Sequence, residues 1–269
     1  MLNQQKEIKI VAGSVTIPGL ANPNQGLWVS TEFMGIMNYS IAESLEKEFK
    51  FPFYIENDGN ACALAERHFG AGKDCDDFLY ITISNGVGGG FFLNGTLYKG
   101  AFGNAGEIGQ IVVVENGRIS GDGTKGTLEI YAATTGLVKN YIEAGGKALI
   151  NGQQADGKLI AAQALADDLA ACKAFELEGY YFGKAIALIH NVLDVRKVII
   201  GGGISLAFSL FETNMIKTVE AHTYKRDYTS LEIVPTPLGY EGAFYGAATL
   251  AILGTENKMS KIFDINLAP

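Results

Sequence analysis

The chain has 269 residues, 48% of them hydrophobic and 19% charged, with 34 glycines and a formal net charge of -8. This composition is typical of a globular α/β protein with one large domain or two smaller ones, and the acidic balance without a basic run argues against a nucleic-acid partner. Three isolated cysteines argue against a disulfide framework or a cysteine-based metal site, so we expect a reducing, cytoplasmic compartment. The longest apolar stretches are too short or too polar to span a bilayer, so we expect no membrane-spanning segment.

Hydrophobic periodicity and the positions of glycine and proline predict strands that alternate with helices. We expect strands at Ile8–Ile17, Leu27–Val29, Phe51–Ile55, Phe78–Ile83, Phe91–Leu93, Thr96–Tyr98, Ile111–Val114, Lys197–Ile200 and Leu231–Val234. We expect helices at Ile41–Phe49, Ala61–Phe69, Ile130–Ala144, Lys158–Cys172, Ala174–Leu193, Leu206–Val219 and Ala243–Leu253. Ser40 is expected to cap the first helix, with Glu43 completing a capping box. This alternation predicts a mixed or parallel sheet with helices on its faces.

Polar side chains are concentrated where the strand ending at Ile55 meets the next helix. Glu56, Asn57, Asp58 and Asn60 all lie in this junction. Ligands of α/β sheets bind just beyond the carboxyl ends of strands. A helix N-terminus favours an ionised aspartate, and such a carboxylate at the mouth of a cleft can accept a proton from a substrate hydroxyl. Asparagine and aspartate are also good helix caps, so this stretch alone leaves open whether Asp58 is a base or a cap.

A glycine-rich run follows the strand Phe78–Ile83. Its members include Ser84, Asn85, Gly86 and Gly88. Successive glycines allow backbone N–H groups to approach a bound anion, although plain bulges and bends also produce glycine-rich strand ends. No Lys-Ser or Lys-Thr pair follows, so the run is not a Walker A loop. Asn94-Gly95, between two apolar runs, predicts a hairpin turn.

Glu107 lies on a second glycine-rich stretch, with Asn104 and Gln110 nearby. A carboxylate on the protein surface would be unremarkable. A carboxylate on a tight glycine loop beside an anion cradle instead favours a ligand with several hydroxyl groups.

Three segments taken together resemble the ROK family of sugar kinases and sugar-responsive regulators. They are Glu56–Ala61, Asn85–Gly90 and Gly103–Gly109, and the resemblance extends from about Val11 to Leu253. It implies an α/β fold of the actin-like (ribonuclease H-like) type, with two lobes around a cleft. The smaller lobe would comprise residues 1–75 with 243–269, and the larger lobe residues 76–242.

The resemblance also implies roles for the polar residues of these segments. Asp58 looks like the general base that takes the proton from the attacked sugar hydroxyl. The residues that look like sugar ligands are Asn57, Asn104, Glu107, Gln110 and Glu129. Two glycine-rich segments look like the family's nucleotide-binding loops. Ser84, Asn85, Gly86 and Gly88 would approach the transferred phosphate, and Gly201, Gly202 and Gly203 would lie under the adenosine of ATP. An active kinase of this kind would use ATP and Mg²⁺.

Two departures from the family pattern affect these expectations. Many members carry a zinc site of one His and three Cys, and the matching residues here are Gln110, Ser120, Asp122 and Thr127. Because no thiolate remains and hydroxyls are poor zinc ligands, we expect no structural zinc. The family also begins with an Asp-x-Gly-Gly-Thr hairpin that embraces the nucleotide phosphates, and nothing before Pro18 matches it. We therefore expect a first lobe that is incomplete at its N-terminus, as a fragment of a longer protein or with that half-site absent or supplied by a partner.

The sequence leaves several classes of function open. The leading hypothesis is ATP-dependent phosphorylation of a hexose or amino-hexose by a ROK-type kinase or truncated relative, with Asp58 as the base. The alternative is a non-catalytic sugar-binding or regulatory domain, and a third class is a structural subunit of an active relative. The expected ligand is a small sugar, and the helices around Lys158–Leu193 are expected to supply a homodimer face.

Overall fold

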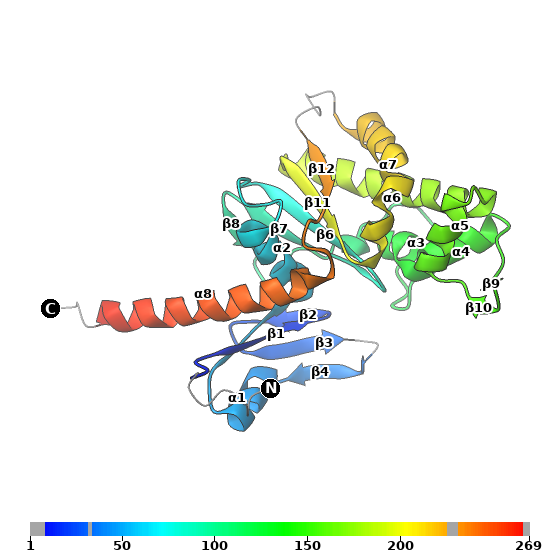
Figure 1. Ribbon diagram of the computed structural model, residues 1–269. Helices are drawn as coiled ribbons and strands as arrows, with labels where there is room; N and C mark the ends of the chain where they lie inside the picture. Colours follow the sequence, from blue (N-terminus) through cyan, green and yellow to red (C-terminus); the bar gives the residue numbers. More distant parts are fainter. Residues whose placement is uncertain (1–8, 32–33, 225–230, 266–269) are drawn as a thin grey trace.

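The computed structural model describes residues 9–31, 34–224 and 231–265, with side chains up to residue 256 (Figure 1). Its strands are β1 (Gly13–Ile17), β2 (Leu20–Asn22), β3 (Leu27–Thr31), β4 (Ile36–Tyr39), β5 (Phe53–Asn57), β6 (Phe78–Ile83), β7 (Val87–Leu93), β8 (Thr96–Tyr98), β9 (Leu149–Ile150), β10 (Gln153–Gln154), β11 (Lys197–Gly201) and β12 (Glu232–Pro235). Its α-helices are α1 (Ile41–Phe49), α2 (Asp58–Phe69), α3 (Leu128–Ala132), α4 (Thr134–Glu143), α5 (Gly157–Leu165), α6 (Leu169–Leu193), α7 (Phe208–His222) and α8 (Gly242–Ile265). No helix within these ranges is both long enough and apolar enough to cross a membrane.

The strands form one central sheet and smaller groups. The central sheet has the order β12-β11-β6-β7-β8, with β12, β11 and β6 parallel and β6, β7 and β8 antiparallel. β1 pairs with β5 in parallel, and β2, β3 and β4 form an antiparallel group. The predicted mixed sheet with helices is confirmed. β2 and β4 fall on segments for which no strand was expected, and α8 continues beyond the expected end at Leu253.

The central sheet is buried on both faces. In β6, Leu79, Ile81 and Ile83 pack into the cluster that includes residues of α3 to α7. Phe78 and Tyr80 pack on the opposite face, with residues of α2. Successive side chains of a strand point to opposite faces, so burial of both faces explains why β6 is a nearly continuous apolar run.

Helix α2 contacts both the central sheet and the pair of strands β1 and β5. It packs against β7 of the central sheet and against α8, which also contacts β1 and β5 (Figure 1). A Cβ atom on Gly246 of α8 would lie 2.2 Å from the carbonyl oxygen of Ala61, and one on Gly90 of β7 would lie 2.7 Å from that of Gly59. Glycine is therefore required for these backbones to approach so closely, and α2 is fixed between its neighbours.

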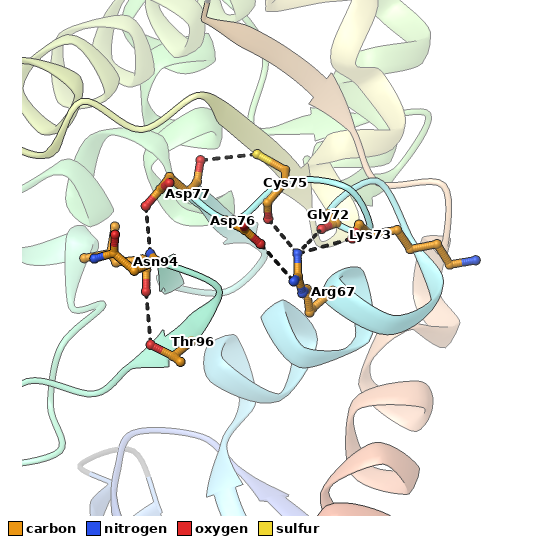
Figure 2. A network of polar contacts seen from close by, with 9 residues as sticks. Arg67, Gly72, Lys73, Cys75, Asp76, Asp77, Asn94 and Thr96 are labelled. Carbon is orange, nitrogen blue, oxygen red and sulfur yellow. Dashed lines mark hydrogen bonds and ion pairs between the residues drawn. The ribbon is translucent and has the colours of Figure 1, made fainter.

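The far end of α2 is anchored by Arg67 (Figure 2). Its guanidinium group donates to the carbonyl oxygens of Lys73 at 3.2 Å and Cys75 at 3.1 Å, and to the carboxylate of Asp76 at 2.9 Å. These contacts fix the turn between α2 and β6. They hold the helix whose opposite end carries Asp58.

One expected strand is absent from the described structure. The segment 111–114 has β-branched residues but no extended partner strand. The N–H groups of Val113 and Val114 both donate to the carbonyl oxygen of Gly126, at 2.8 and 3.1 Å. The segment is therefore held by a loop residue, and local propensity alone does not make it a strand.

The helix expected at Ile130–Ala144 is broken into α3 and α4. Ala133 between them has an extended backbone, with ψ of 172°. The N–H and hydroxyl groups of Thr134 donate to the carbonyl oxygen of Ser84, at 2.9 and 2.8 Å. The break therefore provides an anchor for the loop that follows β6.

The two long helices were expected to meet near Cys172, but α5 ends at Leu165 and α6 begins at Leu169. The carboxylate of Asp168 accepts the N–H of Ala171 at 2.8 Å, which is the capping bond that begins α6. An aspartate before an apolar helix was the sequence signal for this boundary.

The capping box expected at Ser40 is wrong. Ser40 does precede α1, but its side chain makes no capping hydrogen bond. Glu43 instead forms an ion pair with Lys47 at 2.7 Å, one turn further along the helix.

Candidate functional site

The junction between β5 and α2 divides its roles between two neighbouring residues. Asn57 caps the helix: its Oδ1 accepts the N–H groups of Gly59 at 2.9 Å and Asn60 at 3.2 Å, and its Nδ2 donates to the carbonyl oxygen of Gly19 at 3.0 Å. Oδ1 of Asp58 accepts the N–H of Gly59 at 2.8 Å. The cap is therefore Asn57, and the half-buried carboxylate of Asp58 is left for other chemistry.

The environment of Asp58 differs from what its helix position alone predicts. Burial raises the pKa of this carboxyl, and the hydrogen bond from Gly59 opposes that effect only in part. The helix N-terminus is thus not the dominant influence. A raised pKa makes the carboxylate a stronger base than an ordinary aspartate.

Asp58 and Glu107 are brought together by the glycines beside them. A Cβ on Gly59 would lie 2.7 Å from the carbonyl oxygen of Gly89, and a Cβ on Gly106 would lie 2.2 Å from the same atom. The start of α2 and the loop before Ile108 therefore both press against one point on β7. Asp58 precedes the first of these glycines and Glu107 follows the second, and the two carboxylates are near enough for the charge of Asp58 to raise the pKa of Glu107. Gly89 therefore has a packing role.

The pKa of Glu107 is affected by two other carboxylates. Partial burial, and then the negative charges of Asp58 and Glu129, raise the pKa of Glu107, although this side chain stands at an open rim. Carboxylates close enough to raise a pKa form a concentrated set of hydrogen-bond acceptors. Such a set suits a neutral ligand that carries several hydroxyl groups.

A narrow cleft, with no free space for a sugar ring in this conformation, lies beside these residues. Its lining consists of Gly19, Leu20, Ala21, Asn57, Asn60, Gly103, Asn104, Ala105 and Glu107. Three of the expected sugar ligands therefore border one cleft: Asn57, Asn104 and Glu107. Gln110 is exposed at the end of the 3-10 helix Ile108–Gln110 and does not line it.

Glu129 is directed at the glycine-rich turn after β6. Its Oε2 accepts the N–H of Val87 at 3.0 Å, and a Cβ on Gly86 would lie 2.7 Å from the same oxygen. Together with the bonds from Thr134 to Ser84, this contact braces both ends of the turn. Asn85 is exposed at its tip, and Gly88 faces only the methyl group of Thr82, at 3.5 Å. The contact between Glu129 and Val87 joins residues that are far apart in the chain, and no local sequence pattern predicts it.

The second glycine loop lies at the same edge of the sheet. Residues 201–203 follow β11, whose parallel neighbour β6 leads into Ser84. A Cβ on Gly201 would lie 2.1 Å from the hydroxyl oxygen of Tyr80, and one on Gly202 would lie 2.3 Å from the carbonyl oxygen of Ile83. Packing on β6 therefore requires these two glycines. A Cβ on Gly203 would meet only the Tyr240 hydroxyl, at 3.4 Å, so packing among the described residues does not require this glycine.

The residues at the family's zinc positions do not suit a metal ion. Asp122 accepts hydrogen bonds from the hydroxyl of Ser120 and from the N–H and hydroxyl of Thr124, the latter two at 2.9 Å. Thr127 is buried. Within the described ranges no three His, Cys, Asp or Glu residues are grouped closely enough to hold a metal ion. Side-chain hydrogen bonds close this loop.

We expect the purified protein to contain only substoichiometric zinc, since the loop offers no thiolate or imidazole. Metal analysis by plasma mass spectrometry measures this directly, and thermal unfolding with a chelator is the companion measurement. The midpoint of unfolding should not change with the chelator. One zinc per chain would contradict the interpretation of the loop.

The fold is the actin-like α/β fold of the ROK sugar kinases. A ROK family glucokinase from Streptomyces griseus, solved in complex with glucose and AMPPNP, aligns with a TM-score of 0.73 and 29% identity, covering 81% of this chain and 73% of that one. The sequence matches the ROK family over residues 1–253, and the chain belongs to that family. The fold and family expected from the three sequence segments are thus confirmed.

Relatives of known type divide between kinases and regulators. The chain is 32% identical over 253 residues to a glucokinase of Halalkalibacterium halodurans, covering 91% of this chain and 76% of the glucokinase. It is 30% identical over 243 residues to the DNA-binding transcriptional dual regulator NagC of Escherichia coli K12, covering 89% of this chain and 60% of the regulator. The chain thus spans about 60% of the length of that regulator.

Proposed function

We propose that this chain binds a hexose or amino-hexose in the cleft between Asp58 and Glu107 and phosphorylates one of its hydroxyl groups with ATP. The supporting observation is the glycine convergence on β7, which places a half-buried aspartate of raised pKa beside a second carboxylate. A regulator needs sugar ligands but no base. The proposal therefore depends chiefly on Asp58.

In this reaction Asp58 would accept the proton of the attacking hydroxyl, because its Oδ1 is fixed by Gly59 and partial burial raises its pKa. Glu107 and Glu129 would orient the sugar by accepting other hydroxyl protons in hydrogen bonds. Mg²⁺–ATP, when bound, would supply the phosphoryl group. The residues that would hold it are those of the braced turn 84–88 and of the loop 201–203.

The test is a coupled assay of ADP formation with glucose, mannose, N-acetylglucosamine and N-acetylmannosamine. At least one sugar should give saturable turnover that depends on Mg²⁺. Saturable binding of a sugar without turnover of any sugar would instead favour the second candidate, a sugar-responsive regulatory domain. That candidate is supported by the similarity to NagC.

Changing Glu107 or Glu129 to Ala should weaken sugar binding by roughly ten- to a hundred-fold, because each change removes a charged hydrogen-bond acceptor. Isothermal titration calorimetry with the best-bound sugar measures the effect. Glu115→Ala serves as the control, since Glu115 is an exposed glutamate to which no role in the site is assigned. Affinity equal to that of the control would remove the changed residue from the site.

A further inference from the structure

Asn60 is a cleft residue to which neither the family resemblance nor the proposed mechanism gives a role. It occupies the first turn of α2, two residues after Asp58, and lines the cleft. The residue is only 1% exposed. Its side chain therefore lies almost entirely inside the protein.

The orientation of the Asn60 amide is fixed by Glu56. Nδ2 of Asn60 donates to Oε1 of Glu56 at 3.1 Å, and a carboxylate that accepts this bond cannot donate one to the amide oxygen. Glu56 is itself 1% exposed, and its Oε2 pairs with the ammonium group of Lys99 at 2.5 Å. The amide nitrogen therefore faces Glu56, and the amide oxygen faces elsewhere.

The amide oxygen of Asn60 has no hydrogen-bond donor among the described residues. A buried acceptor without a donor is energetically costly and rare, and at the wall of a ligand cleft the natural donor is the ligand. Asn57 contrasts with it, since both polar atoms of the Asn57 side chain are occupied by the helix cap and by Gly19. Of the two asparagines, Asn60 is the one whose side-chain oxygen has no hydrogen-bond donor among the described residues.

We propose that Asn60 is a further substrate-binding residue whose Oδ1 accepts a hydrogen bond from one hydroxyl group of the sugar, with Glu56 and Lys99 as positioning residues. The proposal rests on the proposed sugar-binding function. A hydroxyl can reach the oxygen if the opposite wall, residues 103–105, moves outward, and Asn104 in that wall is already exposed. An amide oxygen selects a hydroxyl that donates, so Asn60 would report on a single position of the sugar ring.

The test couples a protein variant to a change in the ligand. Asn60→Leu removes the acceptor at nearly constant volume. Its affinity and that of the wild type are measured by calorimetry for the tightest-binding sugar among glucose, mannose, N-acetylglucosamine and N-acetylmannosamine, and for the monodeoxy analogues of that sugar. We expect a loss of roughly five- to thirty-fold for the parent sugar and almost no loss for one analogue, the one that lacks the bonded hydroxyl.

Lys99→Met provides a second arm that leaves Asn60 in place, with Lys99→Arg as its conservative control. Lys99→Met should reduce the affinity difference between the parent sugar and that same analogue, and Lys99→Arg should retain the difference. If Asn60→Leu lost affinity equally for every analogue, the Asn60 amide would have only a structural or water-binding role, and the proposal would be overturned. If Asn60→Leu does not fold, Asn60→Ser and the Lys99 variants supply the same comparison. A wild type that binds none of the four sugars would refute the proposed function itself, which is a distinct result.

Discussion

Changing Asp58 to Asn should lower the turnover of sugar and ATP by roughly 10²- to 10⁴-fold, the usual contribution of a general base. Asparagine retains an oxygen that can accept the N–H of Gly59, so the start of α2 should be preserved. The amide cannot accept the hydroxyl proton, however. Sugar affinity should therefore remain within a few-fold of that of the wild type, because the change affects proton transfer more than binding.

The rate comes from the coupled ADP assay and the affinity from calorimetry. Asp74→Asn is the control, because Asp74 is exposed on the turn after α2. Turnover of the Asp58→Asn variant at the control's level would show that Asp58 is not the base. Loss of sugar binding together with turnover would instead mean that Asp58 mainly holds the sugar.

The pH dependence of turnover carries a related expectation. Burial raises the pKa of Asp58, and the base is active only when it is ionised. The value of kcat/KM should therefore fall as the pH decreases, with the acid limb above the ordinary range of an aspartate. An acid limb unchanged by Asp58→Asn would assign that titration to another group.

Changing Glu178 to Met should raise the free energy of unfolding at neutral pH by about 1–3 kcal/mol, the cost of a buried polar group without partners. Glu178 lies on α6 with no exposed surface, and neither carboxyl oxygen has a hydrogen-bond partner among the described residues. A methionine of similar length would replace that carboxyl with an apolar group. The control is Glu176→Met on the same helix, where the glutamate is exposed and pairs with Lys173 at 2.6 Å.

The increase in the free energy of unfolding caused by Glu178→Met should grow as the pH rises. Burial raises the pKa of Glu178 well above the ordinary range. Below the unfolded-state pKa both states hold the proton, and stability is lost as the pH rises because only the unfolded state releases it readily. The difference between Glu178→Met and the wild type should therefore be larger at pH 8 than at pH 5. Denaturant unfolding at both pH values measures it, and a variant that is less stable at pH 8 would contradict the assignment.

The sequence located the catalytic candidate because its signals are local. A strand, a polar junction and a helix of small residues predicted the position of Asp58, and β5 and α2 lie there. The hairpin at Asn94-Gly95 is confirmed for the same reason, since both residues adopt the positive φ that the turn requires.

Features that depend on distant contacts were not predictable in this way. The contact of Glu129 with Val87 spans 42 positions, and the break at Ala133 follows from a bond between Thr134 and Ser84 that spans 50. Glycines were ambiguous for a related reason. Glycine permits both the approach of a ligand and the packing of a neighbouring backbone, and only the fold shows that a backbone packs on Gly89 while a Cβ on Gly203 would meet only the Tyr240 hydroxyl.

The division into two lobes at residue 75 stays a prediction, and α2 is the element that bears on it. This helix begins at the junction with β5 yet packs closely against β7 of the central sheet. The cleft is lined from both sides, by residues 19–21 and by residues 103–105 with Glu107.

The most direct test of a sugar held between Asp58 and Glu107 is a crystal structure with the tightest-binding sugar. One sugar ring should occupy the cleft, with a hydroxyl group within hydrogen-bond distance of the Asp58 carboxylate and another near Glu107. A sugar bound elsewhere, with the Asp58 carboxylate contacting none of its hydroxyls, would contradict the account.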